Sequence, residues 1–105
     1  MDEDTTRLVT VLEEMATLLA GHSERDWADW ISKDVAWIRR GDGYGVLHLL
    51  SAFGGMGSLN DVVFHPMNGN VATTAEAGPV NERFKALTSE VYRLAVALRH
   101  DAQDP

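Results

Sequence analysis

Apolar residues recur every three or four positions over several stretches of the chain, the spacing that places them on one face of an α-helix. The first stretch covers residues 5–20 and the second covers residues 24–40. Gly21 and Gly41 follow them as predicted helix ends. Ser23, with an acid three residues later, is the predicted N-cap of the second helix.

Two further helices are predicted in the second half of the chain. Asp42 can cap a short third helix, and residues 80–100 form the fourth, with Pro79 near its first turn. The expected buried stripe of the third helix consists of Tyr44, Leu47, Leu50 and Phe53. These patterns predict an all-α fold, a four-helix bundle.

Asp34 falls within the apolar arc of the second helix. Because an unpaired buried charge is very costly, this carboxylate must find hydrogen-bond donors. The tryptophans of the same helix are expected in the core, although Trp30 or Trp37 on its flank would also suit an exposed interface anchor.

A long glycine-rich loop separates the third and fourth helices. Its glycines and asparagines favour positive φ angles and therefore a defined turn, in which residues 62–64 can form a short extended segment. We expect the loop to donate hydrogen bonds to Asp34, and a structural hub results. Its predicted members are Asp34, Gly54, Gly55, Gly57 and Asn60.

The 105 residues fit one helical domain, residues 1–105, with frayed ends at 1–4 and 101–105. The chain has no cysteine, no apolar run long enough to cross a bilayer and no signal-peptide pattern at its N-terminus, so a cytoplasmic location without membrane binding is expected. The net charge of −7 repels phosphate backbones, which disfavours nucleic-acid binding.

The negative charge is concentrated in the first helix and in residues 41–80, which contain three acids and neither lysine nor arginine. Such a surface would steer a basic protein partner toward it, although the charge also serves solubility. The predicted partner-binding residues are Asp42, Tyr44, Met56, Asp61, Met67 and Glu76.

Catalytic and metal-binding patterns are weak. The four histidines lack the i, i+4 spacing of a helical zinc motif, and His48 and His65 are the pair that flanks the glycine-rich loop. Ser58, Asp61 and His65 are the residue types of a hydrolase triad, but the strand-to-helix turn that activates such a serine is missing. We therefore expect no catalytic residues, metal or cofactor, and no enzymatic activity.

The glycine-rich loop also carries a family resemblance. The residues concerned are Trp27-x-x-Trp30-Ile31, Gly41-Asp42-x-Tyr44-Gly45, Leu50–Asp61 with its sequence LSAFGGMGSLND, His65-Pro66-x-Asn68-Gly69-Asn70, Asn81 and Tyr92-x-Leu94-Ala95. Over residues 8–98 the chain resembles a family of small bacterial proteins classed as a domain of unknown function. It is also similar to the small acidic immunity proteins that are encoded beside bacterial toxins.

Two functions are consistent with these observations. The first is a non-enzymatic, cytoplasmic protein-binding module, which the resemblance makes concrete as an immunity protein or antitoxin that occludes a basic bacterial toxin. The alternative is a small-ligand sensor. Its pocket would lie between the glycine-rich loop and the second and fourth helices, lined by Trp30, Tyr44 and His48.

Overall fold

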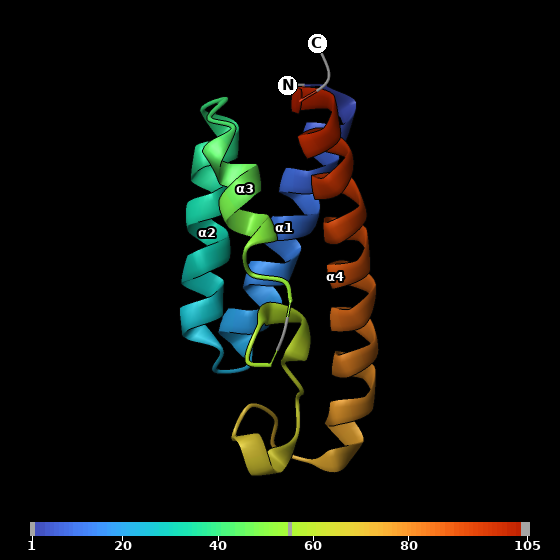
Figure 1. Cartoon of the computed structure of the whole chain (residues 1–105). Coiled ribbons are helices and arrows are strands. Elements are labelled where there is room, and N and C mark those ends of the chain that lie inside the picture. The colour runs from blue at the N-terminus through green and yellow to red at the C-terminus, as the bar shows by residue number, and fades with distance from the viewer. Residues whose placement is uncertain (1, 55, 104–105) are drawn as a thin grey trace.

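Four α-helices run alternately up and down the long axis of the molecule, which measures 49 Å (Figure 1). This computed structural model describes residues 2–54 and 56–103, with side chains up to His100. Its elements are α1 (Glu3–Gly21), α2 (Arg25–Arg39), α3 (Tyr44–Leu50), the 3-10 turns η1 (Leu59–Asp61) and η2 (Pro66–Asn68), and α4 (Thr74–Gln103). The predicted all-α bundle is confirmed.

The helices at the two ends of the chain reach close to its termini. Asp2 caps α1, since its carboxylate accepts a hydrogen bond of 2.7 Å from the Thr5 N–H. Residues 3–4 and 101–103, which belong to the ends expected to fray, are helical. Figure 1 places both ends of the chain at the same end of the bundle.

The start of α2 differs from the prediction. Ser23 does not cap the helix: its φ is +66°, a left-handed turn conformation, and Glu24 occupies the N-cap position without a side-chain hydrogen bond. Ser23 therefore turns the chain between α1 and α2.

Helix α4 begins six residues earlier than predicted, at Thr74, and includes Pro79 in its interior. The Glu76 N–H donates to the hydroxyl of Thr73 at 3.2 Å, so the first turn is capped well before the proline. Thr73-x-x-Glu76 is a capping-box pattern, and this local signal outweighs the proline as a marker of the helix start.

The apolar stripes of the long helices form one core. Helix α1 supplies fully buried leucines, and α4 packs its heptad-like seam against them; Val80 and Leu98, at the ends of that seam, are half-buried. The fully buried apolar side chains include Leu8, Leu12, Met15, Leu19, Ile31, Leu49, Leu59, Phe64 and Val91.

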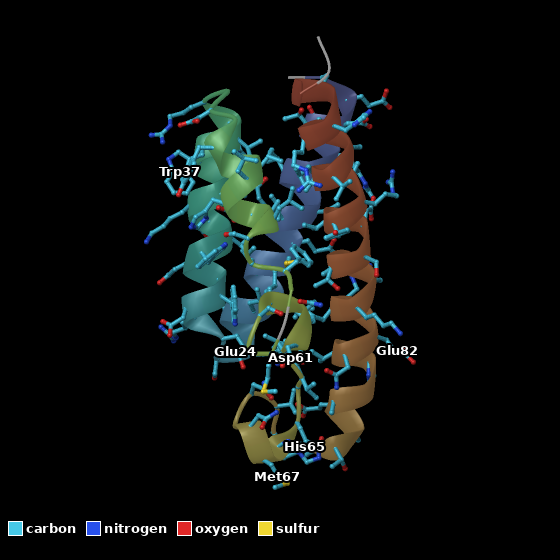
Figure 2. The ribbon with its side chains drawn as sticks, viewed as in Figure 1. Glu24, Trp37, Asp61, His65, Met67 and Glu82 are labelled. Atoms are coloured by element: carbon cyan, nitrogen blue, oxygen red, sulfur yellow. The ribbon has the colours of Figure 1, made fainter. Side chains whose placement is uncertain are left out.

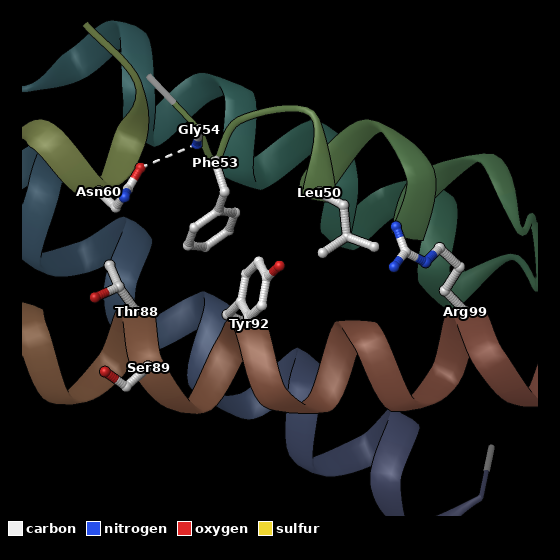
Figure 3. A pocket seen from close by; sticks show the side chains of 8 residues that line it. All are labelled: Leu50, Phe53, Gly54, Asn60, Thr88, Ser89, Tyr92 and Arg99. Atoms are coloured by element: carbon white, nitrogen blue, oxygen red, sulfur yellow. Dashed lines mark hydrogen bonds between the residues drawn. The ribbon is translucent and has the colours of Figure 1, made fainter. Parts of the chain in front are cut away.

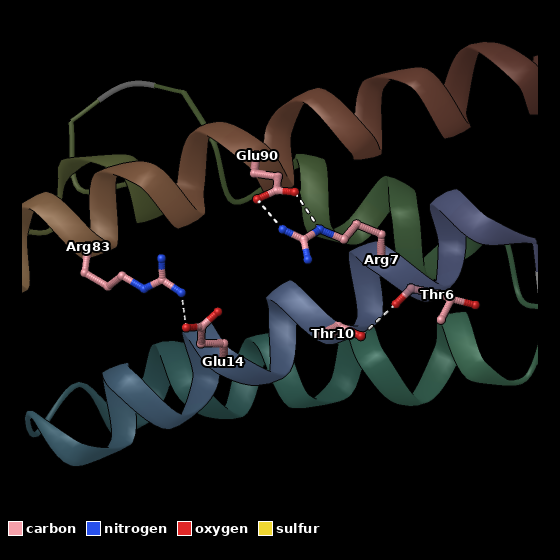
Figure 4. A network of polar contacts seen from close by, with 6 residues as sticks. All are labelled: Thr6, Arg7, Thr10, Glu14, Arg83 and Glu90. Carbon is pink, nitrogen blue, oxygen red and sulfur yellow. Dashed lines mark hydrogen bonds and ion pairs between the residues drawn. The ribbon is translucent and has the colours of Figure 1, made fainter.

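Ion pairs cross the solvent side of this core. Arg7 on α1 makes two hydrogen bonds to Glu90 on α4, at 2.7 and 3.2 Å, and Arg83 pairs with Glu14 between the same helices (Figure 4). Such exposed pairs contribute little energy each. Their effect is to favour one register of α4 on α1.

Helix α3 buries a different face from the predicted one. Tyr44 and Leu47 are each 52% exposed, whereas Gly45 and Leu49 are buried. A Cβ atom at Gly45 would lie 2.8 Å from the Trp37 Cβ. The absence of a side chain at Gly45 therefore lets α3 approach α2 backbone to backbone, which turns the two larger residues outward.

We predict that Gly45→Ala destabilises the protein by about 1–3 kcal/mol, because the new methyl group would overlap α2 unless α3 shifts. Gly43→Ala is a matched control, since its Cβ would meet no atom within 4 Å. Thermal unfolding monitored by circular dichroism measures both. An unchanged Tm for Gly45→Ala would contradict the close-approach explanation.

Candidate functional site

The connection between α3 and α4, residues 51–73, contains the most elaborate polar structure of the molecule. Part of it projects beyond the turn that joins α1 to α2, at the end of the bundle opposite the termini (Figure 1). We divide it into the glycine loop, residues 53–61, and the clamped segment, residues 62–71.

The glycine loop closes on itself. The Leu59 N–H donates to the Ala52 carbonyl at 2.8 Å, and the amides of Gly54 and Gly57 donate to the side chains of Asn60 and Asp61 at 3.3 and 3.0 Å. Gly57 has a φ of +83°, which a side chain would strain. These contacts make the loop a preformed corner.

Only part of the predicted hub is assembled. Gly54 and Asn60 are hydrogen-bonded to each other, and Gly57 bonds to the neighbouring Asp61, whereas Gly55 lies outside the described residues. Asp34 is fully buried, as its position predicts, but its hydrogen bond goes to His48 on α3. The prediction that the glycine loop supplies its donors is wrong.

Two asparagines hold the clamped segment in place. Asn81 on α4 accepts from the Phe64 N–H and donates to the Phe64 carbonyl, both at 2.8 Å. Asn70 accepts from the His65 N–H at 2.8 Å and donates to Val63 and Glu24, each at 3.0 Å. Side-chain amides thereby satisfy backbone N–H and C=O groups in a segment that has no regular secondary structure.

Phe64 anchors the clamped segment in the core. Its side chain is fully buried and packs edge-on against His22 and Phe84, with ring centroids 5.6 and 5.3 Å away. Residues 62–64 form no strand, although Val62 has an extended backbone conformation. The many asparagines in this part of the sequence were the available signal for the clamp. From the sequence, a structural role was predicted for Asn60 but for neither Asn70 nor Asn81.

Two methionines of the connection between α3 and α4 are almost fully exposed. Met56 is 99% exposed and Met67 is 89% exposed, while Asp61 in the glycine loop and Glu76 in the first turn of α4 also face water. Figure 2 shows Met67 near the tip of the part that projects beyond the α1–α2 turn, with Glu24, Asp61 and Glu82 in the same half of the molecule. We call the surface that carries Met56, Asp61, Met67 and Glu76 the projecting end; it combines exposed apolar groups with acids.

The six predicted partner-binding residues do not form one surface. Asp42 and Tyr44 lie at the turn between α2 and α3, at the end of the bundle opposite Met67 (Figures 1 and 2). The Asp42 carboxylate also accepts from the Tyr44 N–H at 2.9 Å, which supports its predicted capping of α3. The projecting end keeps Met56, Asp61, Met67 and Glu76.

A groove of about 620 Å³ lies between the glycine loop and α4 (Figure 3). It is lined by Leu50, Phe53, Gly54, Asn60, Thr88, Ser89, Tyr92 and Arg99. The predicted pocket lining of Trp30, Tyr44 and His48 is therefore wrong for the cavity beside the glycine loop.

Trp30 and His48 instead line a second cleft, of about 380 Å³, on the flank of α2. His48 Nδ1 lies 2.6 Å from Asp34 Oδ1, and its ring stacks on Trp30 with centroids 4.2 Å apart. Trp37 and Tyr44 pack around the same imidazole, at 5.1 and 5.7 Å. We call this the His48 cleft.

Burial raises the pKa of Asp34 from its ordinary 3.8 to about 6, against the hydrogen bond from His48, which lowers it. The other Asp34 oxygen, Oδ2, is buried and has no partner among the described residues. Sequence reasoning recognised that Asp34 needs a donor but did not connect it with His48, which lies fourteen residues further along the chain.

Within the residues that the structure describes, no group of three histidines, aspartates or glutamates could hold a metal ion. In the same part of the chain, no helix combines the length and apolar character that a membrane span requires.

The fold and these sites define a small helical domain with a groove beside its glycine loop and a cleft on the flank of α2. Residues 20–73 match the family model described as a domain of unknown function, DUF6966, and the chain belongs to this family. The matched region is shorter than residues 8–98, over which the resemblance was expected. Neither the curated proteins nor the solved structures gave a match.

We predict that the stability advantage of the wild type over Asp34→Asn falls as pH rises. The folded protein holds the Asp34 proton up to about pH 6, whereas the unfolded chain releases it near 3.8, so the contribution is full below about pH 4 and lost through pH 6. Asparagine does not titrate in this range.

The free energies of unfolding of both proteins should be measured between pH 4 and 7. Their difference should change by about 1–3 kcal/mol in the stated direction. A difference that grows with pH would show that the ionised carboxylate is the better-stabilised form in the folded protein.

Proposed function

We propose that this chain is a non-enzymatic, cytoplasmic protein-binding module that recognises a basic protein partner through its projecting end. The observation that carries the proposal is the exposure of Met56 and Met67, at 99% and 89%, on a connection whose backbone is held by hydrogen bonds. Large apolar groups exposed on an ordered surface are typical of interaction sites.

The hydrogen bonds that hold the clamped segment reduce the entropy lost when a partner binds. The amide clamps at Asn70 and Asn81 fix the segment before any partner arrives, so little backbone entropy is lost on association. Methionine side chains are flexible and polarizable and adapt to apolar partners. The projecting end thus presents flexible methionine side chains on a backbone held by hydrogen bonds.

The charge of this end supports a basic partner. No lysine or arginine occurs from residue 41 to residue 82. Of the exposed acids in this range, Asp61 lies in the glycine loop and Glu76 and Glu82 lie in the first turns of α4, whereas Asp42 lies at the opposite end of the bundle. Long-range attraction between such acids and a basic surface accelerates association.

In its most specific form, the proposal is an immunity protein or antitoxin of a bacterium that occludes a basic toxin domain. The small size and net charge of −7 support it, because an inhibitor of a basic site needs a compact acidic surface.

The groove beside the glycine loop favours a second candidate function, a sensor of a small ligand. Its volume of about 620 Å³ is within the range of small-molecule sites, and Phe53 and Tyr92 form an aromatic wall with ring centroids 5.2 Å apart. Arg99 lines the same groove and would favour an acidic group on the ligand (Figure 3).

We predict that a variant of the projecting end, combining Met56→Ser, Met67→Ser, Asp61→Asn and Glu76→Gln, loses the partner. Exposed side chains carry the changes, and the amide oxygen introduced by Asp61→Asn can still accept from the Gly57 N–H, so the fold should be kept. Affinity capture from the native host with wild-type bait, followed by mass spectrometry, supplies the partner for kinetic measurements.

The matched control carries Asp42→Asn and Tyr44→Ser at the opposite end of the bundle. It should bind the partner at the wild-type rate, whereas the projecting-end variant should associate more slowly and with a weaker salt dependence. Equal association rates for all three proteins at every salt concentration would refute the projecting end as the contact surface. Binding of a small acidic ligand, abolished by Arg99→Gln, would instead favour the sensor.

A further inference from the structure

The His48 cleft lies along the flank of α2, and acidic and aromatic side chains make up most of its lining. It is lined by Asp26, Asp29, Trp30, Lys33, Trp37 and His48. Two of these side chains are carboxylates, and neither Asp26 nor Asp29 forms an ion pair in the described part of the chain. Two others are indole rings, whose faces attract cations.

The hydrogen bond to Asp34 adds a further acceptor to this cleft. When Asp34 is ionised, its Oδ1, 2.6 Å from His48 Nδ1, can only accept, so the imidazole donates there and its neutral form carries the lone pair on Nε2. The ring is held between Trp30, stacked at an interplanar angle of 21°, and the edge of Trp37. His48 is therefore a positioned acceptor, with 19% of its side chain exposed.

We propose that the His48 cleft binds a guanidinium group. The carboxylates of Asp26 and Asp29 supply its counter-charge, and Trp30 and Trp37, whose rings pack against His48, supply an aromatic lining. A guanidinium is planar and weakly hydrated and packs against aromatic rings, which suits this lining better than the compact, strongly hydrated ammonium group. The cleft volume of about 380 Å³ accommodates such a group with its aliphatic stem.

Lys33 lines the same cleft and carries a charge opposite to that of Asp26 and Asp29, which provides a further test. Its ammonium group forms no ion pair in the described residues and is exposed. A cationic ligand must share the cleft with it. Removing the lysine charge should therefore strengthen binding, an effect opposite in sign to that of removing an acid.

The full-length protein should be titrated with blocked arginine amide and with its uncharged isostere, blocked citrulline amide. Indole N–H and His48 Cε1–H resonances in NMR report occupancy of the cleft. Arginine amide should shift these signals, and citrulline amide should bind at least several-fold more weakly, because it keeps the shape and loses the charge.

Three variants test the assignment. Asp29→Asn should weaken arginine amide by about two- to fivefold, and Lys33→Gln should strengthen it by a similar factor. Glu3→Gln, an exposed acid in the first turn of α1, is the matched control and should leave the Kd unchanged. All three positions are exposed, so the fold should be retained, which circular dichroism checks.

A blocked Gly-Arg-Gly peptide distinguishes the source of the guanidinium group. Tighter binding of the peptide than of arginine amide would assign the cleft to an arginine of a protein segment, and equal binding would assign it to a free guanidino compound. The proposal is overturned if citrulline amide binds as well as arginine amide, or if Lys33→Gln leaves binding unchanged or weakens it. None of these results depends on the projecting end.

Discussion

A carboxylate that is completely removed from water is the constraint on which the arrangement of α2 and α3 depends. Asp34 is fully buried in α2, and its Oδ1 lies at hydrogen-bond distance, 2.6 Å, from Nδ1 of His48 on α3. The bond forms only if α3 lies very close to α2, and Gly45 permits this approach because any Cβ there would meet Trp37. Burying this hydrogen-bonded pair adds little stability in itself. Its consequence is geometric, since it determines which face of α3 is exposed.

The connection to α4 follows a different principle, in which side-chain amides replace secondary structure. Asn81 pairs with both backbone polar groups of Phe64, and Asn70 joins the clamped segment to Glu24 at the start of α2. Phe64 adds an apolar anchor. An exposed connection can therefore be ordered without strands, and its outward side chains remain available for contact.

The long helices were predictable because the apolar residues that gain free energy by burial repeat at a regular interval along the chain. The stripes of α1 and α4 repeat at helical spacing, and burial in one core is their direct result. The exposed face of α3 was not predictable in the same way, because a seven-residue helix contains two turns and a close backbone approach at Gly45 overrides side-chain size. The partner of Asp34 was missed for a related reason: its need for a donor is local, whereas His48 reaches it only through the tertiary fold.

The family match covers the middle of the chain and leaves out most of the first helix and all of the last one. Residues 20–73 contain α2, α3, the His48 cleft and most of the projecting end, while nearly all of α1 and all of α4 lie outside the matched region. The matched region shares its core with α4: Phe64 packs on Phe84, and its backbone is clamped by Asn81, both from α4. The two outer helices therefore complete the core around the matched region. The His48 cleft is built from α2 and α3 and lies entirely within residues 20–73.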